Sequence, residues 1–395
     1  MVAGGQRSRW GVVLAYAVAA AATQVLWLTF APITTDSAAH YGVGEGAIGW
    51  LAEVFPLLYV VLALPAGMAL DRWFAHALRG GAALMAAGAL VRLGGDAYGW
   101  ALAGQLLVAL GQPFVLNAVT KLASEYVAPP ARAAAIAIGS GGTFVGLLLG
   151  LVLGPALGSR SDLRTLLAVE AAFVVVTAAL LWIALRERPA GAGALERPIG
   201  PRELRAVWDD RFLRALCGLA FVGFGVFIAL TTWLQPLLKP FGVSESTAGA
   251  MLVGMVVAGV AMTTWWPAAV ARRHAEHRAL LAALLVSAGS CAVLAGVRAV
   301  GAQFALVALF GAFALPALPV LLELAERRAG AAGASAAALV LLCGNLGGIL
   351  LALPIGALHH HAAPAFGLLA LAALCGLPVL RRLGSLREVP RGALA

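Results

Sequence analysis

Residues 41–49 read YGVGEGAIG, and residues 241–249 read FGVSESTAG. Each stretch leads into a long apolar run, and the second lies 200 residues after the first. The same offset returns behind those runs, at Arg72 and Arg272. The identical positions are Gly42 and Gly242, Val43 and Val243, Glu45 and Glu245, and Gly49 and Gly249. A polar pattern repeated at half the length of the chain indicates two halves built from the same order of elements.

The rest of the chain is too apolar to fold in water. Hydrophobic residues make up 62% of the 395 and charged residues only 11%, whereas a soluble domain carries roughly a quarter charged residues. A helix that crosses a bilayer needs ~20 apolar residues. Twelve such runs are predicted, at residues 10–33, 47–70, 79–95, 99–121, 131–157, 164–185, 211–238, 247–271, 278–298, 302–323, 332–358 and 362–382. We therefore predict an all-α integral membrane fold of twelve transmembrane helices, arranged as two pseudo-symmetric six-helix bundles.

The longest polar stretch divides the two halves. It contains Pro189, Pro198 and Pro201 among mixed charges. The expected organisation is an N-terminal six-helix bundle over residues 1–185, a cytoplasmic linker over residues 186–210 and a C-terminal six-helix bundle over residues 211–395.

Positive charges predict the orientation in the membrane. With the N-terminus in the cytoplasm, the inner side receives all but five of the 27 Lys and Arg residues, namely all but Arg92, Arg160, Arg164, Lys239 and Arg298. Cytoplasmic loops carry such an excess, so we expect both termini in the cytoplasm. The composition, rich in Ala, Arg and Gly, favours a multi-pass protein of a bacterial inner membrane. Because the basic residues are spread over many loops, the net charge of +9 does not indicate a nucleic-acid partner.

The sequence lacks the motifs of an enzyme or a metal site. We find no HExxH, Walker A or nucleophile-elbow pattern, and we expect no enzymatic activity. The four cysteines lie in apolar runs without CxxC or Cys/His spacing, so we expect no disulfide, no metal and no cofactor. Adjacent side chains in the run His359-His360-His361 point to different helix faces, which favours a polar helix end over a joint metal or haem site.

Residues 67–72, which close the second span, read GMALDR. This stretch resembles the G-x-L-a-D-R motif of the major facilitator superfamily, although Phe74 stands near the place of the motif's later glycine and the second half has Ala271 in place of the aspartate. The resemblance implies that Asp71 and Arg72 are gating residues, with Asp71 held at the inner gate by a helix N-terminus and nearby arginines. The helix dipole favours a carboxylate at such a place. The alternative is a simple interfacial pair between Asp71 and an arginine.

Further segments indicate a resemblance to one family within this superfamily. They are Arg9-Trp10, Tyr41-Gly42-Val43, Gly49-Trp50-Leu51, Gly104-Gln105, Gln112-Pro113-Phe114 and Lys121-Leu122-Ala123, with weaker echoes at Val226-Phe227, Ala229-Leu230 and Glu323-Leu324. These segments are similar to the feline leukaemia virus subgroup C receptor family, which transports choline, ethanolamine and haem. The resemblance implies an aromatic-lined cavity for an ammonium head, with Trp27, Gln112 and Asn345 as binding residues. Ile228 stands where that family has a Tyr, so one wall of the cavity differs.

The residues also indicate a polar interior by themselves. Gln24 and Trp27 lie three positions apart and share a helix face, and Phe224 and Ile228 follow one line along the seventh span, which Gln235 continues. Amides are costly against lipid and therefore face another helix or water. The candidate substrate-binding residues are Trp27, Gln24, Gln112, Phe224, Ile228 and Asn345. The alternative role for the amides is hydrogen bonding between helices.

Ionisable residues in or beside spans are candidates for proton coupling. The candidates are Glu53, Asp36 and Glu323. Arg327 stands four residues after Glu323, and Glu170 lies near Arg164, so structural ion pairs are the favoured roles for Glu323 and Glu170. Glu53 is the strongest candidate for a protonatable site.

The fifth span has two glycine patterns. Gly141, Gly150, Gly154-Pro155 and Gly158 reproduce part of a pattern seen in proton-coupled antiporters of the same superfamily. Gly142, Gly146, Gly150 and Gly154 form a stripe of small residues that allows a neighbouring helix to approach closely.

The resemblance implies a secondary transporter that moves a small organic solute, a choline- or ethanolamine-like amine or haem, by rocker-switch alternating access. The alternative is a proton-coupled antiporter that exports drugs or metabolites. The expected partners are a small-molecule substrate and the lipid bilayer, with no nucleic acid, and we expect a monomer.

Overall fold

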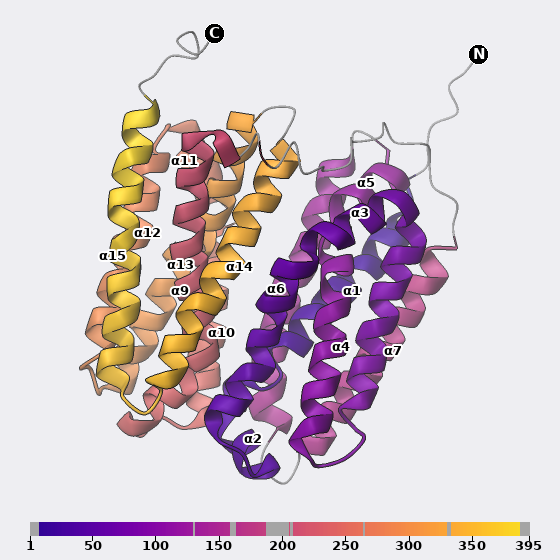
Figure 1. Ribbon diagram of the computed structural model, residues 1–395, viewed down its shortest axis with the longest axis horizontal. Helices are drawn as coiled ribbons and strands as arrows, with labels where there is room; N and C mark the ends of the chain where they lie inside the picture. Colours follow the sequence, from indigo (N-terminus) through magenta and orange to yellow (C-terminus); the bar gives the residue numbers. More distant parts are fainter. Residues whose placement is uncertain are drawn as a thin grey trace. The chain divides into compact units, whose positions relative to one another are not determined.

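The computed structural model describes residues 8–128, 131–158, 163–186, 205, 208–263, 265–329 and 333–387 (Figure 1). Every regular element in these ranges is a helix, which confirms the all-α prediction. The chain divides into two compact units, unit 1 over residues 1–198 and unit 2 over residues 199–395. Most of the predicted linker lies outside the described residues, so its boundaries at 186 and 210 stay a prediction.

Unit 1 contains the helices of the first half. They are α1 (Trp10–Leu28), the 3-10 helix η1 (Ala31–Ile33), α2 (Thr34–Tyr41), α3 (Glu45–Val91), α4 (Tyr98–Leu116), α5 (Val119–Tyr126), α6 (Arg132–Leu157) and α7 (Leu163–Ala184). The short helices α2 and α5 lie at opposite ends of this unit (Figure 1). We call these the α2 end and the α5 end.

The helix α3 contains two membrane spans. Its 47 residues extend over roughly 70 Å at 1.5 Å per residue, more than twice the ~30 Å core of a bilayer. Its backbone leaves the helical region at Trp73 (φ −136°, ψ 53°), which separates a first arm, residues 45–72, from a second arm, residues 74–91. The sequence predicts a longer loop between residues 70 and 79; the structure has only a kink there, because the polar residues on both sides of Trp73 stay helical.

Unit 2 contains the helices of the second half. They are α9 (Arg211–Leu238), the 3-10 helix η3 (Lys239–Phe241), α10 (Glu245–Thr263), α11 (Trp266–Arg272), α12 (Glu276–Leu294), α13 (Val300–Ala329), α14 (Gly333–Ala357) and α15 (Ala362–Arg387). The predicted eighth span, 247–271, divides into α10 and α11, because Pro267 suits the first turn of a new helix. We call the end of unit 2 that holds α11 the α11 end.

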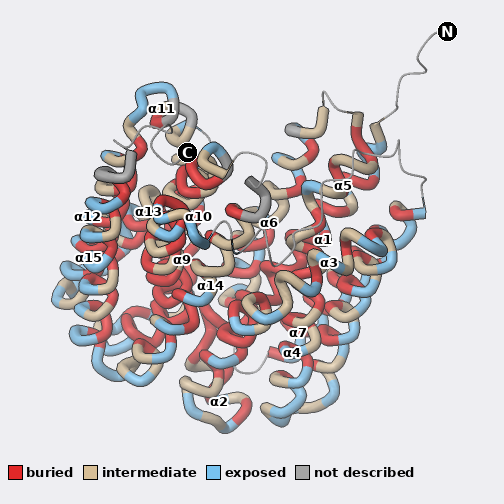
Figure 2. The backbone as a smooth tube through the Cα atoms, turned by 45° about the horizontal axis from the view of Figure 1, so that its top comes forward, coloured by how far each residue is buried: buried red, intermediate tan, exposed pale blue. Residues whose placement is uncertain are grey.

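Eleven helical segments in the described part of the chain are long and apolar enough to cross a bilayer. Counting the two arms of α3 separately gives the twelve predicted spans. Large apolar side chains are exposed along these helices, among them Leu14, Val61, Ile183 and Leu371, each more than half exposed. In Figure 2 the buried stretches follow the helix faces that meet inside each unit, and the exposed stretches lie on the outer faces. Such apolar outer faces are costly in water and are satisfied by lipid.

Glycines bring the first and fifth spans of unit 1 together. A Cβ atom on Gly142 would meet the backbone of Ala17, and one on Gly146 would meet the backbone of Ala21. The helices α1 and α6 therefore approach along their backbones, which no larger residue at these positions permits. This confirms the predicted role of the small-residue stripe.

The corresponding pair in unit 2 packs in the same way. In α14, a Cβ atom on Gly347 would meet the backbone of Phe221 in α9, and one on Gly348 would meet the side chain of Ile228. The seventh and eleventh spans thus repeat the glycine contact of the first and fifth spans. This is the packing expected of two halves that arose by duplication.

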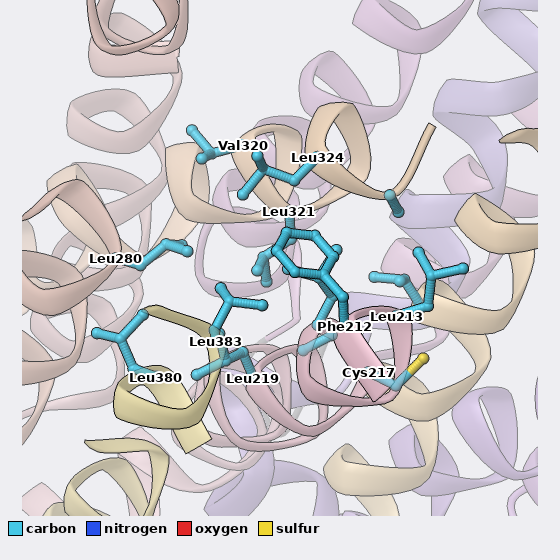
Figure 3. Packing of buried hydrophobic residues seen from close by; sticks show 14 of the residues in the cluster. Phe212, Leu213, Cys217, Leu219, Leu280, Val320, Leu321, Leu324, Leu380 and Leu383 are labelled. Carbon is cyan, nitrogen blue, oxygen red and sulfur yellow. The ribbon is translucent and has the colours of Figure 1, made fainter. Parts of the chain in front are cut away.

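The α11 end of unit 2 has a dense apolar core. Residues of α9, α12, α13 and α15 meet around Phe212, as Figure 3 shows, and include Leu213, Leu280, Leu321 and Leu383. Fully burying a side chain of this size contributes about 1.5–3 kcal/mol relative to leaving it in water. The core fixes the helix ends on which the charged residues of this end are placed.

Candidate functional site

The polar residues predicted in the first span are held by neighbouring backbone and side chains. The indole Nε1 of Trp27 donates to the carbonyl oxygen of Ala52 on the first arm of α3, at 3.2 Å. The amide of Gln24 donates to the hydroxyl of Thr23, at 2.9 Å. Both side chains are buried, with exposed fractions of 8% for Trp27 and 7% for Gln24. The indole ring is thereby fixed in orientation while its π face is not used by the hydrogen bond.

The two glutamines of α4 differ in their partners. The amide of Gln105 donates to the carbonyl oxygens of Leu26 and Leu51, at 3.1 and 3.2 Å, so it ties α4 to both α1 and α3. Gln112 lies two turns further along α4 and is only 4% exposed. Among the described residues, none forms a hydrogen bond with the Gln112 amide. A buried amide without a protein partner is a costly arrangement unless a ligand or water satisfies it.

In unit 2, the predicted residues lie at the contact of α9 and α14. The rings of Phe224 and Phe227 are stacked, with centroids 5.8 Å apart and an interplanar angle of 10°. Ile228 is 1% exposed and packs against Gly348. The amide of Asn345 donates to the carbonyl oxygen of Leu341 one turn earlier in α14, at 2.9 Å. Phe224 thus offers an aromatic surface, and Ile228 supports the helix contact.

Among the described residues, the predicted gating residue Asp71 pairs with a lysine and not with the arginines expected from the sequence. The Nζ atom of Lys121 in α5 lies 3.4 Å from the Asp71 carboxylate and donates to the backbone carbonyl oxygens of Asp71 and Leu70, at 2.6 and 2.9 Å. The guanidinium of Arg72 lies over the exposed ring of Trp73, 4.7 Å from its centroid. Lys121 therefore binds the last turn before the kink of α3, where helix carbonyls are left without internal partners.

A second ionic cluster lies at the α11 end of unit 2. Arg327 in α13 is 3.3 Å from Glu276, at the start of α12, and 3.4 Å from Glu323, one turn earlier in its own helix. The pair of Glu323 with Arg327 confirms the ion pair predicted from their spacing. In the same region, Arg328 donates to Asp210, whose other oxygen caps the first turn of α9. The second half thus has a carboxylate–cation pair at its loop between spans eight and nine, provided by Glu276 in place of the missing aspartate at position 271.

A fully buried ion pair lies near the α2 end of unit 1. The Arg92 guanidinium, at the end of α3, is 3.1 Å from the Glu170 carboxylate in α7, and both side chains are 0% exposed. The Thr29 hydroxyl at the end of α1 donates to the same carboxylate oxygen, at 2.8 Å, and accepts from Arg92 Nη1, at 3.1 Å. Glu170 thus forms a structural ion pair, but its partner is Arg92 and not Arg164, the neighbour that the sequence suggested, because the packing of α3 against α7 brings Arg92 to the carboxylate.

Two of the predicted candidates for proton coupling, Glu53 and Asp36, lie in unit 1. Glu53 is 2% exposed, on the first arm of α3. Asp36 lies in the first turn of α2 and is partly buried. Nothing in their surroundings assigns a proton to either residue, and their role stays a prediction.

Several residues that form polar contacts between helices were assigned no role from the sequence. Asn117, just after α4, donates to the carbonyl oxygen of Ala63 and accepts from the hydroxyl of Tyr59, at 3.1 and 2.8 Å. Lys121 is one of two lysines in the chain, and Arg92 is one of the few basic residues expected away from the cytoplasm. The small number of such basic residues could have identified Lys121 and Arg92 from the sequence, since a lysine or arginine deep in a membrane protein needs a carboxylate or carbonyl partner.

These features match a known family. A model of the Major Facilitator Superfamily matches residues 12–352. The chain belongs to the major facilitator superfamily. A crystal structure of a bacterial homologue of the human lysosomal transporter Spinster, inward-facing and unoccupied, superposes with a TM-score of 0.76 at 16% identity, over 97% of this chain and 96% of that one. That likeness shows the major facilitator fold.

Curated members of the superfamily are similar in sequence. Solute carrier family 49 member A3 from Danio rerio is 29% identical over 317 residues, which cover 76% of this chain and 67% of that protein. The choline/ethanolamine transporter flvcr2b from Danio rerio is 24% identical over 279 residues, 64% of this chain. The matched part spans 57% of the length of that transporter. The resemblance to the choline and ethanolamine transporters of this superfamily is thereby confirmed.

Proposed function

We propose that the protein carries a small organic cation, such as choline or ethanolamine, across a cell membrane by alternating access of its two six-helix halves. The similarity to transporters named for choline and ethanolamine is the observation that carries this proposal. The chemistry of the predicted site supports it, because a desolvated aromatic face attracts a quaternary ammonium by ~2 kcal/mol or more. Haem is a second cargo that the family resemblance allows.

The residues proposed for the site divide the recognition between them. In unit 1, the proposed roles are an aromatic face from Trp27 for the ammonium and a hydrogen bond from the Gln112 amide to a hydroxyl of the solute. In unit 2, Phe224 is proposed to provide an aromatic face. The alkyl side chain of Ile228, where relatives of the resembled family have an aromatic ring, favours a less tightly caged ammonium. Gln24 in unit 1 and Asn345 in unit 2 are proposed as further polar binding residues.

The charged residues support a gate and an orientation. In this proposal, Asp71 and Arg72 form the inner gate together with Lys121, and the α5 end of unit 1 faces the cytoplasm. The distribution of Arg and Lys supports the same direction, with both termini inside. We propose a monomer in the inner membrane of a bacterium.

A binding experiment tests the substrate class. Purified protein is screened by thermal shift against choline, ethanolamine, haem and hydrophobic drugs, with the wild type, Trp27→Ala and Trp100→Ala compared. Trp100 is an exposed tryptophan of α4 and serves as the matched control. We expect choline or ethanolamine to raise Tm in the wild type and in Trp100→Ala but not in Trp27→Ala. Stabilisation by drugs alone would favour the antiporter instead.

A further inference from the structure

The buried pair of Arg92 and Glu170 joins three helices. Arg92 ends α3, Thr29 ends α1, and Glu170 lies two turns into α7. A Cβ atom on Gly104 of α4 would meet the aliphatic part of Arg92, so the glycine makes the space through which the arginine reaches the pair. The chain thus places an ionic contact where close helix packing has excluded lipid and water.

The hydrogen bonding of this pair is incomplete. Among the described residues, Glu170 Oε1 and Arg92 Nε have no hydrogen-bond partner, although they are shielded from solvent, whereas Arg92 Nη2 lies 3.1 Å from Glu170 Oε2. Burying a charged pair costs several kcal/mol per ion, and excellent geometry with all donors and acceptors satisfied is needed to offset that cost. Glu170 Oε1 therefore lacks the partner that a buried ionised carboxylate needs, and a bound proton would remove that need by neutralising the group.

Further charged and polar groups lie toward the α2 end of unit 1. Asp96 stands four residues after Arg92, and its side chain is 68% exposed. His40 Nε2 in α2 lies 3.6 Å from Asp96 Oδ1. The hydroxyl of Tyr41 interacts electrostatically with both Arg92 and Asp96. The groups that act directly on Glu170 are Arg92 from α3 and Thr29 from α1; the titratable groups next outward are Asp96, His40 and Tyr41.

We propose that Glu170 is a proton-binding site of unit 1, which exchanges protons with water at the α2 end and releases Arg92 and Thr29 when it is protonated. Asp96, in the turn that follows Arg92 between α3 and α4, is the carboxylate proposed to take up the released arginine. The proton neutralises the carboxylate, and Arg92, which stays charged, must then move toward Asp96 so that its charge is not left buried without a partner.

Loss of the hydrogen bond from Thr29 to Glu170 affects the end of the first span. Thr29 is the last residue before the chain leaves α1 and enters η1 through Phe30, and Ile33 has non-helical dihedral angles (φ −128°, ψ 38°). The hydroxyl contact to Glu170 is therefore a tie between α7 and the joint of α1 and η1. Protonation loosens this joint without changing the glycine contact of α1 with α6.

Infrared difference spectroscopy of the purified protein, recorded without any solute, tests the proton site. Acidification from about pH 8 to about pH 5 covers the window in which surface carboxylates remain largely ionised. We expect the wild type to gain the carbonyl band of a protonated, poorly hydrated carboxylic acid. The band should be absent from Glu170→Gln and unchanged in Glu323→Gln, the matched control at a partly exposed ion pair. Superimposable spectra of wild type and Glu170→Gln would overturn the proposal.

Thr29→Val provides the second test and covers the case in which Glu170→Gln is not recovered folded. The valine keeps the shape of the side chain and removes the hydroxyl that donates to the carboxylate. Because that donor stabilises the ionised form, we expect the band to appear at a higher pH than in the wild type. An unchanged midpoint would contradict the proposal. Since no solute is present, failure of choline transport leaves this result unaffected.

Discussion

The Lys121 ammonium donates to the backbone carbonyl oxygen of Asp71 at 2.6 Å and lies 3.4 Å from the carboxylate of the same residue. One side chain thereby holds both the charge of the predicted gate and the helix turn that carries it. Because Asp71 precedes the kink at Trp73, this contact fixes the point at which the first arm of α3 passes into the second.

Removing the lysine should impair the gate without preventing expression. For Lys121→Gln we expect uptake of labelled choline by proteoliposomes to fall about tenfold or more, equivalent to ~1.4 kcal/mol, and Asp71→Asn should act alike. Lys239→Gln, the change at the other lysine of the chain, is the control. Normal uptake by Lys121→Gln would remove Lys121 from the gate.

The glycine contact between α1 and α6 should tolerate no added methyl group. For Gly146→Ala we expect a lower Tm of the purified protein, because the new Cβ meets the backbone of Ala21 and overpacking costs about 1–3 kcal/mol. Gly141→Ala is the matched control in the same helix, since nothing lies within 4 Å of its added Cβ. If Tm falls equally in the two variants, the contact of residue 146 with Ala21 does not determine the loss of stability.

The two carboxylates that share Arg327 should differ in importance. Glu276 is 3% exposed at its side chain and Glu323 is 42% exposed, while Arg327 is 50% exposed. For Glu276→Gln we expect a loss of about 1–3 kcal/mol, since the hydrogen bond that its buried side chain accepts from Arg327 no longer involves a carboxylate, and for Glu323→Gln less than ~1 kcal/mol. Thermal unfolding in detergent measures both. A larger loss in Glu323→Gln would contradict the ranking.

Glu125 should make the α5 end sensitive to pH. Partial burial raises the pKa of the Glu125 carboxyl above its ordinary value of 4.5, against the opposing effect of the nearby Lys121 charge. A raised pKa in the folded protein favours the protonated form, so its stabilising contribution is complete below 4.5 and is lost as the pH rises through the raised value. For Glu125→Gln we therefore expect a higher Tm than the wild type at neutral pH and a smaller difference in acid. A difference that is constant with pH would contradict this role.

Composition and periodicity predicted most of the fold. The run from Arg211 to Leu238 begins and ends as α9 does, and the stripe from Gly142 to Gly154 faces α1 as expected. The boundaries near Trp73 and Pro267 were less predictable. Polar residues at the end of a bundle can stay helical, as they do around Trp73. A tryptophan pair next to a proline is compatible both with the end of a span and with the start of a new helix.

Ion pairs between residues far apart in the chain could not be predicted from the sequence. The spacing of four residues gave the contact of Glu323 with Arg327, because an α-helix fixes it. The contacts of Glu170 with Arg92 and of Asp71 with Lys121 join residues 78 and 50 positions apart, and only the packing of separate helices decides them.

Counterflow in proteoliposomes tests the proposed function most directly: vesicles loaded with unlabelled choline are diluted into labelled choline, with wild type, Trp27→Ala and Trp100→Ala compared. We expect the wild type and Trp100→Ala to accumulate label transiently, as alternating access requires, and Trp27→Ala to lose this accumulation. Wild-type vesicles that gain no more label than protein-free vesicles, for choline and ethanolamine alike, would contradict the assignment of an organic cation as the cargo.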